Sequence, residues 1–405
     1  MATSRRRFIS HAIFAALLLS AIAWSAAAAA LIPLPDGPND FNSPGFIVQH
    51  AWVKFAYLGA QPFRADLTGP EKDATIARFF EINRLIGEQD RIAGDPASDA
   101  GAAAAARARS DALRAERGSI KNAVQVMLEG RLTRAIKAAG LTRHVGGDVV
   151  WPPVNIEFQD PPSVLVTSPR SEIKKQSESL LDGDLPIERV QEIEAKAERN
   201  GTTSALVVEI GGIAMYPAII PPDADYHFVL QDIAHEWTHH YLYFTPLGRR
   251  YFASAKLTTI NETVADRVGR ELGDWLFATY PLSRAGANSG GRSASPAAAG
   301  IDFVTEMRGL RRQVEVLLRD GEIGEAERLM EERRQFLAAN GYYIRRLNQA
   351  YFAFHGSYAD SAGSIDPIGP KLAALREQSA SLRQFVARVR DVTSEDELDR
   401  AIATP

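Results

Sequence analysis

Two histidines and a glutamate beside the first of them form a pattern whose spacing suits metal chemistry. His235 and His239 are four residues apart, so a helix places both imidazoles on one face, one turn apart. Glu236 then projects beside them, at the rim of the site. In this arrangement two neutral histidines bind zinc, and the glutamate acts as general base on metal-bound water. The segment therefore predicts a zinc-dependent hydrolase with Glu236 as its catalytic residue.

A third protein ligand is needed, because two histidines leave a catalytic zinc one ligand short. Glu262 and Asp266 are four residues apart in a second predicted helix at 261–279, and they share one helix face. We expect Glu262 to complete the ligand set and Asp266 to accept the second N–H of His235. A capping box is the competing interpretation, in which Thr259 caps that helix and Glu262 hydrogen-bonds back to its start.

The composition restricts the alternatives. The chain of 405 residues has no cysteine, which excludes thiolate metal ligands, disulfides and cysteine nucleophiles. Its formal net charge is −4, and no basic face interleaved with aromatic residues indicates nucleic acid as a partner. His240 points about 100° away from His239 on the helix, and His227 lies about two turns before His235. We expect His240 and His227 to be structural.

The two segments together resemble a known group of enzymes. His235–His239 (HEWTH) followed by Asn261–Asp266 (NETVAD) is similar to the gluzincin metallopeptidases, which include thermolysin. The layout of the chain also looks like the bacterial predicted-aminopeptidase family of gluzincins. The resemblance implies a peptide or protein substrate, and a Tyr or His from the C-terminal part that stabilises the oxyanion. His355 and Tyr358 are the candidates, and packing of an aromatic ring explains each of them equally well.

The same resemblance leaves the position of cleavage open. Aminopeptidases of this group carry a Gly-x-Met-Glu-Asn motif before the zinc helix, and its glutamate holds the substrate amine. Gly212–Tyr216 occupies that place here and lacks the glutamate. Glu209 is the nearest acid, on a predicted strand whose alternation lets it face either the cleft or solvent. We retain a slight preference for aminopeptidase over endopeptidase activity.

The surrounding sequence predicts an α+β fold that is mainly helical. A small sheet is expected from strands at 154–158, 163–166, 204–210 and 213–216, the last two joined as a hairpin by Gly211-Gly212. This sheet would pack on a zincin-type helix at 226–244 that carries the two histidines, with Asp225 as its N-cap. A long helical hairpin is expected in the C-terminal half, at about 301–320 and 323–352, with further helices at 100–117, 120–139, 188–198 and 371–389.

The N-terminus predicts export. Arg5-Arg6-Arg7 precedes an apolar run at 8–30 that ends in small residues, as in a signal peptide, and the run is also long enough for a retained membrane anchor. We therefore expect an extracytoplasmic protein, secreted or attached to the membrane through 8–30. Beyond 1–30, we divide the chain into a linker at 31–70, an N-terminal helical region at 71–145 and a zinc metallopeptidase domain at 146–405.

Two other classes of function are compatible with these patterns. The first is a non-catalytic protein that keeps a zincin fold to bind metal or a partner, although a structural site has no use for the base Glu236. The second is membrane-anchored partner binding by the charged helical hairpin at 301–352, which can coexist with catalysis.

Overall fold

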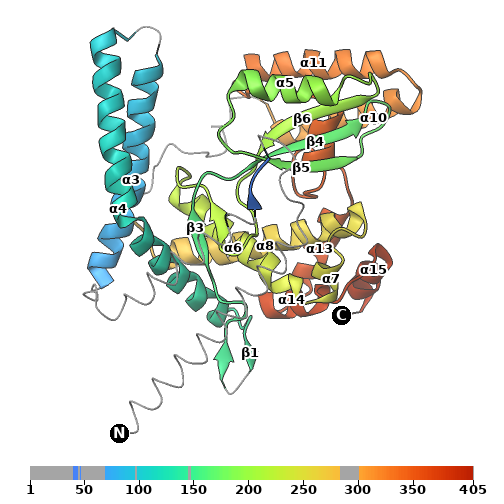
Figure 1. The fold of residues 1–405 in the computed structure, drawn as a ribbon. Helices are drawn as coiled ribbons and strands as arrows, with labels where there is room; N and C mark the ends of the chain where they lie inside the picture. The colour runs from blue at the N-terminus through green and yellow to red at the C-terminus, as the bar shows by residue number, and fades with distance from the viewer. Residues whose placement is uncertain are drawn as a thin grey trace.

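The computed structural model describes residues 40–43, 46, 69–95, 98–144, 147–282 and 301–404 (Figure 1). Over these residues the protein is an α+β structure in which helices predominate and the sheets are small, as the sequence predicts. The predicted signal peptide or anchor at 1–30 and most of the linker predicted at 31–70 lie outside the described residues. None of the helices in the described ranges has both the length and the apolarity needed to cross a membrane.

A pair of long helices begins the described structure, α3 (Gly69–Gly94) and α4 (Ala100–Ala138). The two helices predicted at 100–117 and 120–139 are one continuous helix, because Gly118 and Ser119 continue the helical hydrogen bonding instead of ending it. Asp99 caps α4 by accepting a hydrogen bond from the Ala102 amide at 2.8 Å. Apolar residues of both helices belong to the same buried cluster as those of the helix that carries the two histidines.

Three small sheets are present among the described residues. The largest has the antiparallel order β5-β4-β6, from β5 (Ser177–Leu181), β4 (Ser163–Pro169) and β6 (Thr203–Glu209). Helix α5 (Ile187–Ala197) packs on β6 through a cluster that includes Val190 and Val207. The other two sheets are β3 (Ile156–Phe158) parallel to β7 (Ala218–Ile220), and β1 (Arg143–His144) antiparallel to β2 (Asp148–Val149).

The prediction of a hairpin around Gly211-Gly212 is wrong. The strand partner of β6 is β4, and the segment after the glycines forms a single bridge between Ile213 and Ile219 before β7. The chain leaves the sheet there because it packs onto the histidine helix: a Cβ on Gly212 would lie 2.8 Å from Glu236 Oε1. Strand β5 was not predicted, since its sequence Ser-Glu-Ser-Leu-Leu is polar over most of its length.

The two helices that carry the chemistry are α6 (Tyr226–Tyr243) and α8 (Ala255–Thr279), joined through the short helix α7 (Pro246–Arg249). Asp225 caps α6 as predicted, accepting from the Phe228 amide at 2.8 Å. Helix α8 begins earlier than predicted and is capped by Ser254, so Thr259 lies inside the helix. The capping-box interpretation of Glu262 is therefore wrong.

The C-terminal part contains the predicted helical hairpin, α10 (Phe303–Arg319) and α11 (Ile323–Ala339), held by a shared apolar cluster. The helix predicted to continue to 352 ends at Ala339, because Gly341 adopts a left-handed φ of 86° that closes helices. A separate helix, α12 (Gln349–His355), lies on the face of the large sheet opposite α5. The predicted helix at 371–389 is also divided, into α13 (Ile368–Glu377) and α14 (Leu382–Val389), and α15 (Glu395–Ala403) follows.

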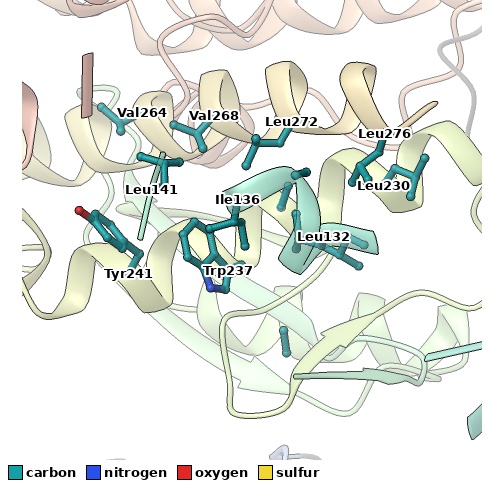
Figure 2. Packing of buried hydrophobic residues seen from close by; sticks show 14 of the residues in the cluster. Leu132, Ile136, Leu141, Leu230, Trp237, Tyr241, Val264, Val268, Leu272 and Leu276 are labelled. Carbon is teal, nitrogen blue, oxygen red and sulfur yellow. The ribbon is translucent and has the colours of Figure 1, made fainter. Parts of the chain in front are cut away.

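The packing of α6 on α8 forms the centre of the largest apolar cluster. Figure 2 shows Val264, Val268 and Leu272 of α8 directed toward Trp237 of α6 and toward the end of α4. Two glycines of α8 allow the helix backbones to approach closely. A Cβ on Gly269 would lie 3.0 Å from His235 N, and one on Gly273 would lie 2.6 Å from Gln231 Cα. At both positions the added Cβ would meet backbone atoms of α6, which cannot move aside as a flexible side chain can.

Gly273→Ala is expected to lower the free energy of unfolding by about 1–3 kcal/mol, because the added methyl forces the backbones of α6 and α8 apart. Gly130→Ala is the matched control, a helical glycine of α4 whose Cβ would meet nothing within 4 Å. It should leave stability unchanged or raise it by up to about 1 kcal/mol. Urea denaturation measures both changes, and a Gly273→Ala variant as stable as wild type would contradict the close-packing argument.

Candidate metal centre

Three side chains from α6 and α8 converge on one point. His235 and His239 project from the same face of α6, with their Nε2 atoms 3.0 Å apart. Glu262 of α8 places Oε2 at 3.6 Å from the Nε2 of His235 and at 3.5 Å from the Nε2 of His239. The potential ligand atoms of the three residues all lie within 4.8 Å of one another, so this group can hold a metal ion.

Hydrogen bonds behind the two imidazoles determine which nitrogen faces the centre. Asp266 Oδ1 lies 3.0 Å from His235 Nδ1, and Asn261 Oδ1 lies 2.9 Å from His239 Nδ1. Each oxygen accepts an N–H from its ring, so in the neutral imidazoles both Nε2 atoms carry lone pairs directed at the shared point. Asp266 thus contacts His235, the histidine expected from the sequence. The contact of Asn261 with His239 was not predicted, although Asn261 directly precedes Glu262 in the sequence.

The centre concentrates electron pairs around one point. Burial lowers the pKa of His235, but Asp266 and Glu262 raise it more, so the net pKa lies well above its ordinary value. Glu262 Oε2 is buried and accepts no hydrogen bond from a described residue. Burial alone raises the pKa of Glu262, but the adjacent His239 and His235 lower it more, so the net pKa lies well below its ordinary value. A carboxylate anion and two imidazole lone pairs at these distances repel one another unless a proton or a metal cation lies between them.

The separations also fit a particular coordination. Nitrogen and oxygen ligands at roughly 2.0–2.2 Å from a tetrahedral zinc lie about 3.3–3.5 Å from one another. The three measured separations of 3.0, 3.5 and 3.6 Å scatter around that range. Two nitrogens and one carboxylate oxygen are a donor set that zinc accepts when no thiolate is present.

Tyr251 holds the other carboxylate oxygen of Glu262. Its hydroxyl donates to Glu262 Oε1, and its ring meets the His239 ring edge-on at 6.1 Å between centroids. Burial and the charge of Glu262 raise the pKa of Tyr251 well above its ordinary value, so the hydroxyl stays protonated and keeps donating. The sequence carries no signal for this contact, since Tyr251 is one tyrosine in a loop outside both motifs.

Glu236 lies beside the three convergent residues and is 5% exposed. It forms no hydrogen bond or ion pair with any residue that the structure describes, and its Oε1 packs against the backbone of Gly212. Burial raises the pKa of Glu236 well above its ordinary value; His235 opposes this shift, and the charges of Asp232 and Glu262 add to it. A buried carboxylate with a raised pKa next to a metal site is suited to exchanging protons.

The two candidate oxyanion donors lie in different surroundings. The pKa of Tyr358 is raised by burial and then by the charges of Glu262, Asp266 and Glu236, so its hydroxyl lies within electrostatic reach of the centre. His355 instead packs against Tyr351 and Phe354, and burial alone lowers its pKa to about 4. The charges of the centre thus act on Tyr358, whose described ring contact is with Phe354, whereas burial is the only cause of the pKa shift of His355.

The remaining histidines of α6 make structural contacts, as expected. His240 Nε2 donates to the Met215 carbonyl at 2.7 Å, and burial lowers the pKa of this histidine to about 4. His227 lies 2.6 Å from Asp274 Oδ1, away from the centre. Glu209, the nearest acid that the sequence offers for a substrate amine, is exposed at the end of β6.

Comparison with protein-family models, with curated proteins and with solved structures finds no match for this chain.

Asp266→Ala is expected to weaken zinc binding by about 10–100-fold, because His235 loses the acceptor that fixes its tautomer. Asp274→Ala is the matched control. Asp274 also lies on α8 and also contacts a histidine, but that contact, with His227, is remote from the centre. Competition with a zinc chelator measures both affinities. Equal affinity in the two variants would show that Asp266 does not orient a ligand.

Proposed function

We propose that the protein is a zinc-dependent peptidase of the gluzincin type, with His235, His239 and Glu262 as metal ligands and Glu236 as general base. The observation that carries this proposal is the combination of three convergent ligand atoms with a buried, unpaired carboxylate at their side. A purely structural metal site needs the three ligand atoms but has no use for the buried carboxylate of Glu236. The proposal therefore favours catalysis over metal binding alone.

A zinc ion bound by these residues would act as a Lewis acid, lowering the pKa of a water molecule and polarising the substrate carbonyl. Asp266 and Asn261 hold the two imidazoles with Nε2 toward the centre, and Tyr251 keeps the Glu262 carboxylate in place. Because these contacts exist before substrate arrives, little reorganisation is needed at the moment of reaction.

Glu236 supplies the proton transfers. Its carboxylate accepts a proton from the attacking water and passes it to the nitrogen of the leaving amine. The raised pKa of Glu236 makes it a stronger base than a carboxylate in water, which favours the first transfer. Tyr358 remains protonated because its pKa is raised, so its hydroxyl can donate a hydrogen bond to the developing oxyanion.

An aminopeptidase also needs a carboxylate for the substrate ammonium. Glu209 is exposed, but Asp232 is a buried alternative one turn before Glu236 on α6. Both carboxylates lie against Gly212: a Cβ added there would be 2.9 Å from Asp232 Oδ2 and 2.8 Å from Glu236 Oε1. The two carboxylates therefore lie close together, and this supports the preference for aminopeptidase activity.

Glu236→Gln is expected to keep one zinc per chain and to lose turnover of peptides by about 100–10,000-fold, because the base is removed and the ligands are not. His235→Ala is expected to lose most of the zinc and the activity together. Metal analysis and a peptide-library assay measure the two quantities. An active wild-type protein without bound metal, or a fully active Glu236→Gln variant, would refute the mechanism.

Peptides with free N-termini should be cleaved at their first bond, and the same peptides with acetylated N-termini should resist cleavage. Asp232→Asn should raise KM for the free peptides, because the ammonium loses its counter-charge. Mass spectrometry of the products distinguishes the outcomes. Equal cleavage of both peptide forms at internal bonds would assign an endopeptidase and leave the zinc mechanism unaffected.

A further inference from the structure

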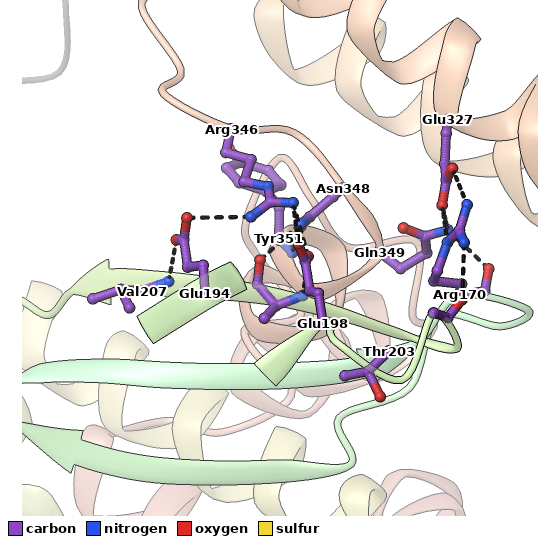
Figure 3. Close-up of polar contacts among 12 residues, drawn as sticks. Arg170, Glu194, Glu198, Thr203, Val207, Glu327, Arg346, Asn348, Gln349 and Tyr351 are labelled. Atoms are coloured by element: carbon purple, nitrogen blue, oxygen red, sulfur yellow. Dashed lines mark hydrogen bonds and ion pairs between the residues drawn. The ribbon is translucent and has the colours of Figure 1, made fainter. Parts of the chain in front are cut away.

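The segment 356–367 connects α12 to α13 and carries Tyr358, the candidate oxyanion donor. No helix or strand covers this segment, so its position depends on the contacts at its two ends. Figure 3 shows how α12, before it, is fixed to the large sheet and α5. Arg346 contacts both oxygens of Glu198 at 2.8 Å, and the Gln349 side chain donates to the Arg170 carbonyl at 2.8 Å.

Tyr358 and Ala359 face different parts of the structure. Tyr358 packs on the apolar cluster between α12 and the large sheet, where its ring contacts Phe354. Ala359 is buried in the main cluster, to which α6 and α8 belong. Its amide donates to Thr263 Oγ1 at 3.2 Å, and Thr263 directly follows the proposed ligand Glu262. The backbone next to Tyr358 is therefore hydrogen-bonded to the residue next to a proposed metal ligand.

Asp360 connects this segment to two arginines of α8. Arg267 Nη2 donates to Asp360 Oδ1 at 2.8 Å, and the two side chains are only 22% and 20% exposed. Arg270 Nη2 lies 3.4 Å from Asp360 Oδ2 and 3.3 Å from Asp266 Oδ2. Thr263, Arg267 and Arg270 are three or four residues apart, so one face of α8 makes all these contacts. Charge-assisted hydrogen bonds of this kind are stronger than neutral ones.

The packing around Asp360 leaves little room for movement. A Cβ on Gly369, in the first turn of α13, would lie 2.9 Å from Asp360 Oδ1 and 3.0 Å from the Ala359 carbonyl oxygen. Arg267 Nη2 also donates to the Gly369 carbonyl at 3.1 Å, so one guanidinium joins the segment to α13 as well as to α8. In such close packing a shift of residues 359–360 requires neighbouring backbone to shift too.

We infer that Asp360 is a positioning residue: through Arg267 it holds the backbone that carries Tyr358 on α8, and so fixes the Tyr358 hydroxyl relative to the metal centre. The inference rests on the proposed function, in which Tyr358 donates to the oxyanion. The charges of Glu262, Asp266 and Glu236 contribute to the raised pKa of Tyr358, in agreement with this placement. A displacement of roughly 1 Å at such a group can lower the rate by about 100-fold.

The first test compares kinetics of the full chain loaded with zinc. Asp360→Ala should lower kcat for peptides by about 10–100-fold and leave KM and zinc affinity within about twofold of wild type, because the ligands and Glu236 keep their contacts. Asp366→Ala is the matched control. Asp366 lies in the same segment, is 21% exposed and pairs with Lys256 of α8 at 2.9 Å. Its loss should leave kcat unchanged.

A double-mutant cycle separates positioning from a general structural role. Tyr358→Phe should lower kcat by about 100–1,000-fold, as expected for loss of an oxyanion donor. In the Tyr358→Phe background, Asp360→Ala should change kcat by less than about twofold, because the hydroxyl that it positions is already absent. A general structural role would instead lower kcat by the same factor in both backgrounds, and that result would overturn the inference.

Hydrogen exchange followed by mass spectrometry tests the anchoring without reference to activity. The amides of Tyr358, Ala359 and Ser361 are hydrogen-bonded, and in Asp360→Ala they should exchange at least about tenfold faster than in wild type. In Asp366→Ala they should exchange at the wild-type rate. If Asp360→Ala fails to fold, Asp360→Asn keeps the shape of the side chain and should change kcat and exchange in the same directions.

Unchanged exchange at these amides would overturn the inference, and so would a loss of zinc affinity equal to that of Asp266→Ala, because Asp360 would then act on a ligand. A Tyr358→Phe variant with wild-type kcat would overturn it as well and leave the zinc mechanism standing. If wild type cleaves no peptide, the proposed function fails, and the exchange rates alone then decide whether Asp360 anchors the segment.

Discussion

The close contact between α6 and α8 sets the geometry on which the metal centre depends. Gly269 lies directly against the backbone of His235, and Gly273 lies against Gln231 one turn earlier. Because the helices touch at the backbone, the ligands from α6 and Glu262 from α8 meet at separations of 3.5–3.6 Å. A larger residue at either glycine would move a whole helix, and the convergence of the three ligands would be lost.

The same contact explains how several charged groups can be buried together. Glu262, Glu236 and Asp232 all lie in the interior, where an unpaired charge is costly. Part of that cost is offset for Glu262 by the hydrogen bond from Tyr251 and by the two adjacent imidazoles, which lower its pKa. A cation held by the three convergent side chains would offset more of it. This imbalance is the physical basis for assigning a metal to the site.

Local patterns in the sequence predicted the part of the site that depends on local geometry. His235 and His239 on one helix face, and Glu262 in step with Asp266, follow from helical periodicity alone. Tyr251 lies outside both motifs, so no periodicity singled it out. The hairpin at Gly211-Gly212 failed for a similar reason: two glycines predict a turn, but only the contact with Glu236 shows that the chain turns toward a helix.

In the C-terminal half, the hydrophobic pattern predicted the helices but overestimated their length. Gly341 ends α11, and Asn348 caps α12 by accepting from the Tyr351 amide at 2.9 Å. Apolar periodicity continues across both signals, and so the sequence indicates one helix where the structure has two. The ion pair between Asp360 and Arg267 was not predicted either, because the two residues are 93 positions apart and only the tertiary fold brings them together.

The positions of the proposed catalytic groups along the chain have a consequence for folding. The residues from His235 to Asp266 are close together in the sequence, so bringing them together has a small loop-closure entropy cost. We therefore expect the three proposed metal ligands to converge early in folding. Tyr358 follows α12, which must first dock on the large sheet through contacts with β4 and β6. In the proposed mechanism a partly folded chain could therefore hold its metal while lacking its oxyanion donor. In that mechanism, hydrolysis would require the long-range contacts to be complete.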